Sequence, residues 1–404
     1  MTDITTPKGW AARQIALDRE RTARFPQLGE RKQGRMSVSP FAFLRGSAPL
    51  FYELLAARPE LADGPGGEGW LVGDLHLENF GAFGPARTQG AVSEKRAATF
   101  NLNDFDEAVR GPFRWDVLRL LTSLILAGRE LGASGTAVLE LATHLLDGYV
   151  ASAFDSAPLP SPPAPVTTLI ERVQSRSREE LLDARTEAHA GKRHFLRGDR
   201  YRDLSPDVLA AVPAALARYA ERVHADERPR PEQLVMIDAA HRIAGTGSLG
   251  VLRVAVLTSG KGGGDGGWIF DLKEQPASSA AHLLGPQTLT PADAAVAAFQ
   301  ACLEAPPRML ATTEIAGVGM VGRRLTPQED KLSLGKIARD QLGPLAHYLG
   351  ALVGRAHARG ATKPSPSWTP QERTAHLGRA VTLAGLHEAI YLEWSFALSS
   401  MHAR

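Results

Sequence analysis

The chain has 404 residues, enough for two to three domains of ordinary size or for one large two-part enzyme. Lys and Arg number 46 against 44 Asp and Glu, and a net charge of +2 excludes a strong electrostatic attraction to nucleic acid or to an anionic membrane. The single cysteine, Cys302, excludes a disulfide framework, and without an apolar run of about 18 residues we expect a cytoplasmic protein with no membrane partner.

The first part of the chain is predicted to be mainly helical around two short strands. Residues 8–57 read as helices. Short apolar runs at 70–72 and 98–108 each adjoin a polar cluster, which indicates paired strands that carry side chains at their edge. The stretch 115–128 is apolar nearly all round and predicts a buried helix, and a further helix is expected over 134–154.

A proline-rich linker at 158–166 leads into a charged region that we expect to be helical. Its residues 171–203 mix both signs densely, which fits either a solvated helix face with ion pairs or a basic wall over an anionic ligand. Two apolar or β-branched runs, 251–259 and 268–275, are joined by a glycine-rich turn and predict a hairpin. The remaining expected elements are a helix from Thr290, a strand over 317–325, and helices over 335–359 and near 386–401.

Two polar clusters carry the chemistry. Asp74 is followed by four residues and then by Asn79, and Asp104 comes about 25 residues later, an arrangement that phosphoryl-transfer sites use. Asp74 would orient an attacking hydroxyl and accept its proton, while Asn79 and Asp104 offer the hard oxygen ligands that magnesium prefers. Each residue alone is more often a turn or cap residue, so the prediction depends on their combination.

The segments GDLHLENFG and NDFDEA resemble the catalytic and metal-binding loops of the aminoglycoside-phosphotransferase branch of the protein-kinase-like fold, where the patterns read approximately HGDxHxxN and IDFDxA. This resemblance implies an α+β, two-lobed fold with a mainly helical large lobe and a small antiparallel-sheet lobe. It also implies that Asp116, in WDVLRLL, braces the catalytic-loop backbone, and His76 fits this branch better than protein kinases.

The whole chain also resembles a bacterial family catalogued only as a domain of unknown function. The segments that carry this resemblance are SPFAFLRG, GDLHLENFG, GPFRWDVLRL and LVGRAHARG, which span nearly the full length. The family supplies a relative but no substrate.

A kinase-like site also needs a phosphate cover and a cation, and residues 1–70 offer neither. Downstream, Gly245, Thr246, Gly247, Ser248 and Gly250 belong to a GxGxxG turn between expected strands, and Lys273 lies on a later strand. The segment LGALVGRAHARG resembles the helix that ordinarily precedes the catalytic loop. We therefore expect a circular permutation. Its parts are a catalytic part (1–157), a helical insertion or substrate wall (158–235), a nucleotide-covering lobe (236–330) and helices that complete the large lobe (331–404).

The glycine turn and Lys273 each have a second interpretation. GxGxxG also occurs in dinucleotide-binding domains, and Asp271 lies about 20 positions downstream, but the run after the last glycine reads as a strand instead of a helix. A plain glycine hairpin and a surface lysine remain the simpler alternatives. The acidic partner of Lys273 is open between Asp293, Glu304 and another carboxylate, since Glu274 should point to the opposite sheet face.

Several polar residues fit either a functional or a structural role. His76 is either catalytic or hydrogen-bonded within its loop, and Asp106 is either a second metal contact or a surface carboxylate. Arg45, Arg323 and Arg324 are candidate anion contacts that also fit surface ion pairs.

From these patterns we expect a magnesium- and ATP-dependent phosphotransferase that acts on a small molecule through a hydroxyl or amine. The acceptor pocket is expected to take a wall from residues 155–235. Two alternatives share the nucleotide site: transfer of AMP in place of phosphate, and nucleotide binding without turnover. The sequence gives no oligomeric state.

Overall fold

The computed structural model describes residues 5–86, 98–189, 192–263 and 265–402 as a mixed α+β chain whose paired strands are all antiparallel. The helices are α1 (Pro7–Thr22), α2 (Gly29–Met36), α3 (Pro40–Gly46), α4 (Ala48–Ala57), α5 (Pro59–Ala62), α6 (Arg114–Glu130), α7 (Gly135–Ala153), α8 (Ala164–Gln174), α9 (Arg178–Asp183), α10 (Pro206–Arg222), α11 (Pro291–Cys302), α12 (Arg339–Gly360) and α13 (Pro370–His402). Within the described ranges, no helix combines the length and apolarity needed to cross a membrane.

The strands fall into a large sheet and several small pairings. The large sheet runs β11 (Ala311–Ile315), β12 (Val318–Arg324), β10 (Trp268–Glu274), β9 (Arg253–Thr258), β8 (Met236–Arg242) and β7 (Tyr201–Arg202). The small sheets are β13 (Asp330–Lys331) with β2 (Phe80–Phe83) and β3 (Thr99–Leu102), β1 (Glu68–Leu71) with β4 (Val109–Pro112), and β5 (Thr186–His189) with β6 (Lys192–Phe195). Strands are thus found beside both polar clusters, but the two expected strands do not pair with each other, since β1 pairs with β4 and β3 pairs with β2.

The helical part of the molecule is built around α6, whose residues from Trp115 to Ala127 are all buried. Helices α7 and α12 pack against each other beside it, and their apolar side chains join those of α6 in one core. Apolar residues on every side predicted this burial, because a helix of that composition must be covered all round. The helices predicted over 115–128, 134–154 and 335–359 are confirmed, whereas the last helix begins much earlier than expected, at Pro370.

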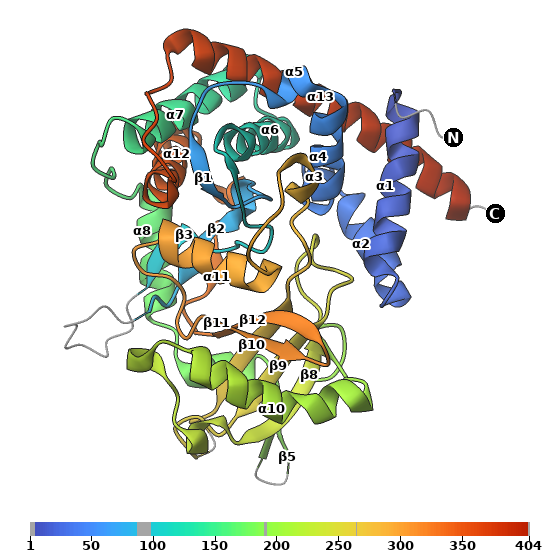
Figure 1. Cartoon of the computed structure of the whole chain (residues 1–404), viewed down its shortest axis with the longest axis vertical. Helices are drawn as coiled ribbons and strands as arrows, with labels where there is room; N and C mark the ends of the chain where they lie inside the picture. The colour runs from blue at the N-terminus through green and yellow to red at the C-terminus, as the bar shows by residue number, and fades with distance from the viewer. Residues whose placement is uncertain (1–4, 87–97, 190–191, 264, 403–404) are drawn as a thin grey trace.

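The large sheet is covered on both faces. Alternate residues of β9 point to opposite sides, so that Val254 and Val256 pack with α10 while Ala255 and Leu257 pack on the other face. Phe195 of β6 joins the second face. Figure 1 shows this sheet with α10 across it, and it shows the first and the last helices of the chain together in the helical part.

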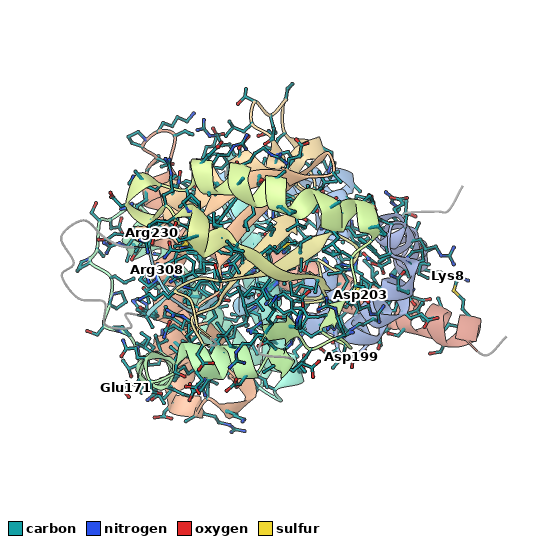
Figure 2. The ribbon with its side chains drawn as sticks, turned by 90° about the horizontal axis from the view of Figure 1, so that it is seen from below. Lys8, Glu171, Asp199, Asp203, Arg230 and Arg308 are labelled. Atoms are coloured by element: carbon teal, nitrogen blue, oxygen red, sulfur yellow. The ribbon has the colours of Figure 1, made fainter. Side chains whose placement is uncertain are left out.

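Residues 158–235 differ from the expected helical wall. They contain the β5–β6 pair and strand β7 as well as helices, and α10 and β7 complete the large sheet's packing. Their arginines are held in ion pairs: Arg193 with Asp183 and Asp265, and Arg197 with Asp203 and Asp238. The ion pairs of the first alternative are thus present, but these two arginines lie on β6 and in the loop after it instead of on a helix face. The segment also contacts the helical part, since the carbonyl of Asp199, labelled with Asp203 in Figure 2, accepts a hydrogen bond from Arg31.

Candidate active site

The loop after β1 carries Asp74, and a buried carboxylate fixes its backbone. The Asp116 carboxylate, on α6, accepts hydrogen bonds from the amides of Val72 (2.6 Å) and Gly73 (3.0 Å). Gly73 adopts a φ of 84°, and any side chain there would clash with the carbonyl of Glu107. These contacts fix the backbone conformation of the loop at Gly73, and with it the position of the next residue, Asp74.

Asp116 is itself positioned from α12. His357 Nε2 lies 3.2 Å from Asp116 Oδ2, and its Nδ1 lies 3.1 Å from the Tyr149 hydroxyl. The His357 ring stacks on Phe113 with centroids 4.3 Å apart. A helix near the end of the chain thus supports, through one carboxylate, a loop near its beginning.

The side chain of Asp74 is clamped by an arginine that the motifs did not single out. Arg119, on α6 and fully buried, donates from Nε to Asp74 Oδ1 at 2.8 Å and also from Nη2 to the same oxygen. Burial raises the pKa of Asp74 to about 6, although the Arg119 charge acts in the opposite direction. The sequence did offer one sign of this role. Arg119 is a charged residue in a largely apolar helix, and it lies three positions after Asp116, on the same helix face.

His76 and Asn79 close the loop as reciprocal caps of the short helix Leu77–Asn79. The amide of Glu78 donates to His76 Nδ1 at 3.1 Å, and the His76 amide donates to Asn79 Oδ1 at 2.6 Å. Burial holds the pKa of His76 well below its usual value, so the ring is neutral with its proton on Nε2. One lone pair of Asn79 Oδ1 is thereby occupied, and a second remains for another partner.

The second polar cluster brings Lys273 to the same place. Lys273 Nζ, on β10, forms an ion pair with Asp106, whose Oδ1 accepts from Gln275 Nε2 at 3.1 Å. Asp106 is therefore the carboxylate partner of Lys273, and neither Asp293 nor Glu304 is. Asp293 is bonded to the hydroxyls of Thr290 and Thr312, and Glu304 pairs with Arg355.

Asp104 lies between two lysines. Burial acts to raise its pKa, but the charges of Lys273 and Lys331 outweigh burial and hold the pKa of this carboxyl below its usual value. Asp104 is therefore an anion at neutral pH, as a metal ligand must be.

The glycine turn folds over Asp74. A Cβ at Gly247 would lie 3.6 Å from Asp74 Oδ2 and 3.3 Å from the Arg45 carbonyl oxygen. Gly250, with a φ of 107°, rests against the Arg21 carbonyl at the end of α1, and Arg35 of α2 donates to the Gly245 carbonyl. The turn thus bridges the sheet and the first helices.

The turn does not open a helix, as a dinucleotide-binding turn would, because strand β9 follows it. Asp271 is held by Arg242 and Arg253 in a buried ion cluster, which occupies the carboxylate that this alternative needs. The structure therefore excludes the dinucleotide interpretation.

These groups surround one cavity of about 360 Å³, which we call the central cavity. The expected site residues that line it are Asp74, His76, Asn79, Asp104, Asp106, Gly245, Thr246, Gly247, Ser248 and Lys273. Gly250 and Asp116 do not line the cavity. Gly250 shapes the backbone of the glycine turn, and the Asp116 carboxylate holds the backbone amides of Val72 and Gly73. The lining includes no described residue from 155–235, so the expected substrate wall is not part of this cavity.

Cations that the motifs did not reveal also line the central cavity. Lys331, on β13, reaches it and has no ion-pair partner among the residues that the structure describes. Lys32 is buried and pairs with Asp18 at 2.7 Å, and Arg45 pairs with Glu78 at 2.6 Å. Of these three cations, only Arg45 was predicted from the sequence as an anion contact. Of the other two expected anion contacts, Arg323 pairs with Glu329, and Arg324 lies over the Trp268 ring.

Asn79 and Asp104 are two of the described residues that could supply oxygen ligands to a hard cation at this cavity. Within the described ranges, no group of three or more His, Cys, Asp or Glu side chains is arranged to hold a metal ion. Asn79 and Asp104 offer one amide and one carboxylate oxygen at the cavity wall. Magnesium is commonly bound in this way, with few protein oxygens and with phosphate and water as its other ligands.

Comparison with protein families identifies the class of this chain. It belongs to the family described as "Uncharacterized protein conserved in bacteria (DUF2252)", whose model matches residues 24–399. Neither the curated proteins nor the solved structures include a match. Helix α1, which lines the central cavity, precedes the matched range.

Proposed function

We propose that this protein is a magnesium- and ATP-dependent phosphotransferase with a circularly permuted kinase-like fold, acting on a hydroxyl or amine of a small molecule. One observation carries the proposal: Asp74 and Asp104, from the first part of the chain, and Lys273, from a distant strand, line one cavity beneath a glycine turn. Phosphoryl transfer requires mainly positioning and neutralisation of charge, which these groups supply.

The order of elements in the large sheet supports a kinase-like nucleotide lobe. The turn lies between strands β8 and β9, and Lys273 lies on the next strand, β10, much as a strand lysine follows the glycine-rich loop in protein kinases. Helix α11 then follows before β11 and β12. The helical part is assembled from both ends of the chain, which is the arrangement that a permutation requires.

Each cavity residue has a role in this proposal. The Asp74 carboxylate orients the acceptor and receives its proton, with Arg119 holding its geometry. Lys273 and Lys331 contact phosphate oxygens. Asn79 and Asp104 would hold magnesium, which neutralises phosphate charge when it is bound. His76, neutral and hydrogen-bonded within the loop, keeps Asn79 in place.

The lysine partner departs from the protein-kinase pattern, in which a glutamate of the helix after the third strand pairs with the lysine. Here Asp106, two residues after Asp104, takes that place. A phosphate that reaches Lys273 must therefore compete with Asp106, and the pairing links the lysine to the metal-binding loop.

The proposal is tested by incubating the protein with ATP, magnesium and a metabolite extract and following products by mass spectrometry. We expect an acceptor that gains one phosphoryl group, and a loss of transfer of about 100-fold or more in Asp74→Ala and Asp104→Asn, since both remove groups at the reacting centre. Asp199→Asn is the matched control, because this carboxylate is 96% exposed and lies outside the cavity.

Other products decide between the alternatives. An acceptor that gains AMP would show nucleotidyl transfer, with the β- and γ-phosphates released together. Binding of ATP without hydrolysis or transfer, and without any effect of Asp104→Asn on the protein's cellular role, would indicate a regulatory nucleotide-binding protein.

A further inference from the structure

A second hollow, of about 760 Å³, lies on the far side of the catalytic loop, between α6, α7 and the start of α12. We call it the apolar groove. Leucines such as Leu124 and Leu345 make most of its wall apolar, and Glu140, His144, Arg339 and Asp340 also line it. Its volume lies within the usual range for small-molecule sites. Leu77, the residue after His76, forms part of its wall, so the groove and the central cavity share the catalytic loop as a partition.

A third hollow, of about 400 Å³, adjoins both the central cavity and the apolar groove, and we call it the connecting hollow. It shares Arg45 and Thr246 with the central cavity, and it shares Leu131 and Leu334 with the apolar groove. Its wall mixes charged and polar residues, among them Arg35, Glu78 and Glu130, with apolar ones such as Val38 and Phe41. A molecule that extends from Asp74 into the groove thus passes Arg45 and Glu78 before it reaches the groove's leucines.

We propose that the apolar groove holds the body of the acceptor, and that the acceptor is therefore an amphipathic alcohol or amine with an alkyl or aryl tail. This inference rests on the proposed function. The polar head lies in the connecting hollow beside Arg45 and Glu78. Transfer of the tail from water to the leucine-lined walls of the groove lowers the free energy of the complex. Leu131, 48% exposed at the junction, is covered when the tail binds.

Such an acceptor would take the γ-phosphoryl group of ATP in a single displacement. Its hydroxyl oxygen or amine nitrogen forms a bond to the γ-phosphorus of ATP while the bond from that phosphorus to the bridging oxygen breaks, and ADP leaves with the bridging electron pair. The acceptor proton passes to the Asp74 carboxylate. No oxidant or other co-reactant is needed.

The test uses N-phenylnaphthylamine, a fluorescent apolar amine, together with hexyl, heptyl and octyl glucoside below their micelle concentrations. We expect saturable dye binding, displacement by the glucosides that strengthens up to about fourfold per added methylene, and phosphorylation of octyl glucoside but much less of glucose. Ala137→Trp, on the groove wall, should weaken dye and glucoside binding about tenfold or more by filling the space.

Two further variants keep the result interpretable. Leu131→Glu places a charge at the junction and should also weaken binding, and it serves if Ala137→Trp does not fold. Leu139→Glu is the matched control, because Leu139 is exposed on the same helix as Ala137 but does not line the groove. Its binding should equal that of the unaltered protein.

Equal dye and glucoside binding in the Ala137→Trp, Leu131→Glu and unaltered proteins, or an affinity that does not depend on chain length, would overturn the proposal. A second copy of the chain in the groove would give a concentration-dependent dimer that groove variants abolish, which also overturns it. Affinity for a fluorescent ATP analogue is measured in parallel. Its absence in the unaltered protein would contradict the proposed function, whereas its presence without tail dependence would contradict only the acceptor assignment.

Discussion

Asp74 and Arg119 together set the protonation state of the candidate base at the scale of single residues. The carboxylate is buried enough for its pKa to rise to about 6, and the buried guanidinium prevents a larger rise. A base with this pKa is mostly ionised at pH 7 and still accepts a proton readily, which is the compromise that general-base catalysis favours.

This pair predicts the pH dependence of transfer. The kcat/KM of the unaltered protein should fall below about pH 6, because protonated Asp74 cannot accept the acceptor proton. Arg119→Met removes a charge that lowers the pKa of Asp74, so the falling limb should move to higher pH, and Arg119→Lys should restore it in part. An acid limb at the same pH in Arg119→Met would show that this arginine does not tune the carboxylate.

The residues that the sequence revealed are those with a fixed spacing. Asp74, Asn79 and Asp104 follow a pattern that chemistry imposes, and Lys273 follows from its place after the glycine turn. Lys331 has no such pattern, and Arg119 offered only its position on the helix that carries Asp116, which does not show that it reaches Asp74. The pairing of Lys273 with Asp106 also needed coordinates, since Asp106 lies far away in the sequence and the two named candidates, Asp293 and Glu304, both follow Lys273.

At the scale of elements, the glycine turn has two functions that can be separated. Gly250 has the backbone conformation that L side chains rarely adopt and lies against the Arg21 carbonyl. Gly247 has ordinary backbone dihedrals and faces Asp74. One glycine therefore allows the turn to form on α1, and the other keeps space above the carboxylate.

Two substitutions in this turn should affect different properties, one the stability of the protein and the other its binding of nucleotide. Gly250→Ala should destabilise the protein by about 2 kcal/mol or more, through its positive φ and the clash with Arg21, as measured by chemical denaturation. Gly247→Val should destabilise the protein less than Gly250→Ala, although its Cβ would lie 3.3 Å from the Arg45 carbonyl oxygen, and it should weaken binding of an ATP analogue by about tenfold through loss of space in the cavity. Equal effects of both substitutions on unfolding would contradict this division.

The expected elements were most accurate where one pattern fills a whole helix or strand. The buried helix α6 and the strands β9, β10 and β12 lie where the sequence indicated. The β5–β6 pair and the two-residue β7 were missed, because their charged sequences have no apolar alternation and β7 is fixed by pairing with β8. Long-range pairing of this kind leaves no local pattern.

At the scale of the whole molecule, both ends of the chain build the same part. Trp394 of α13 is buried with Trp10 of α1, Phe43 of α3 and Leu54 of α4, and Figure 1 shows α1 beside α13. His357 of α12 supports Asp116 behind the loop that carries Asp74. The site therefore depends on contacts between distant stretches of the chain, and these contacts are what a permuted arrangement must preserve.

Isothermal titration with ATP and magnesium tests most directly whether the two distant parts bind one triphosphate. We predict that the unaltered protein binds MgATP, and that Lys273→Met, from the sheet part, and Asp104→Asn, from the first part, each weaken binding by about tenfold or more, since each removes a charge that faces the phosphates or their metal. Asp199→Asn should bind as the unaltered protein does. No binding of MgATP to the unaltered protein, or equal affinities for it and both cavity variants, would contradict the account.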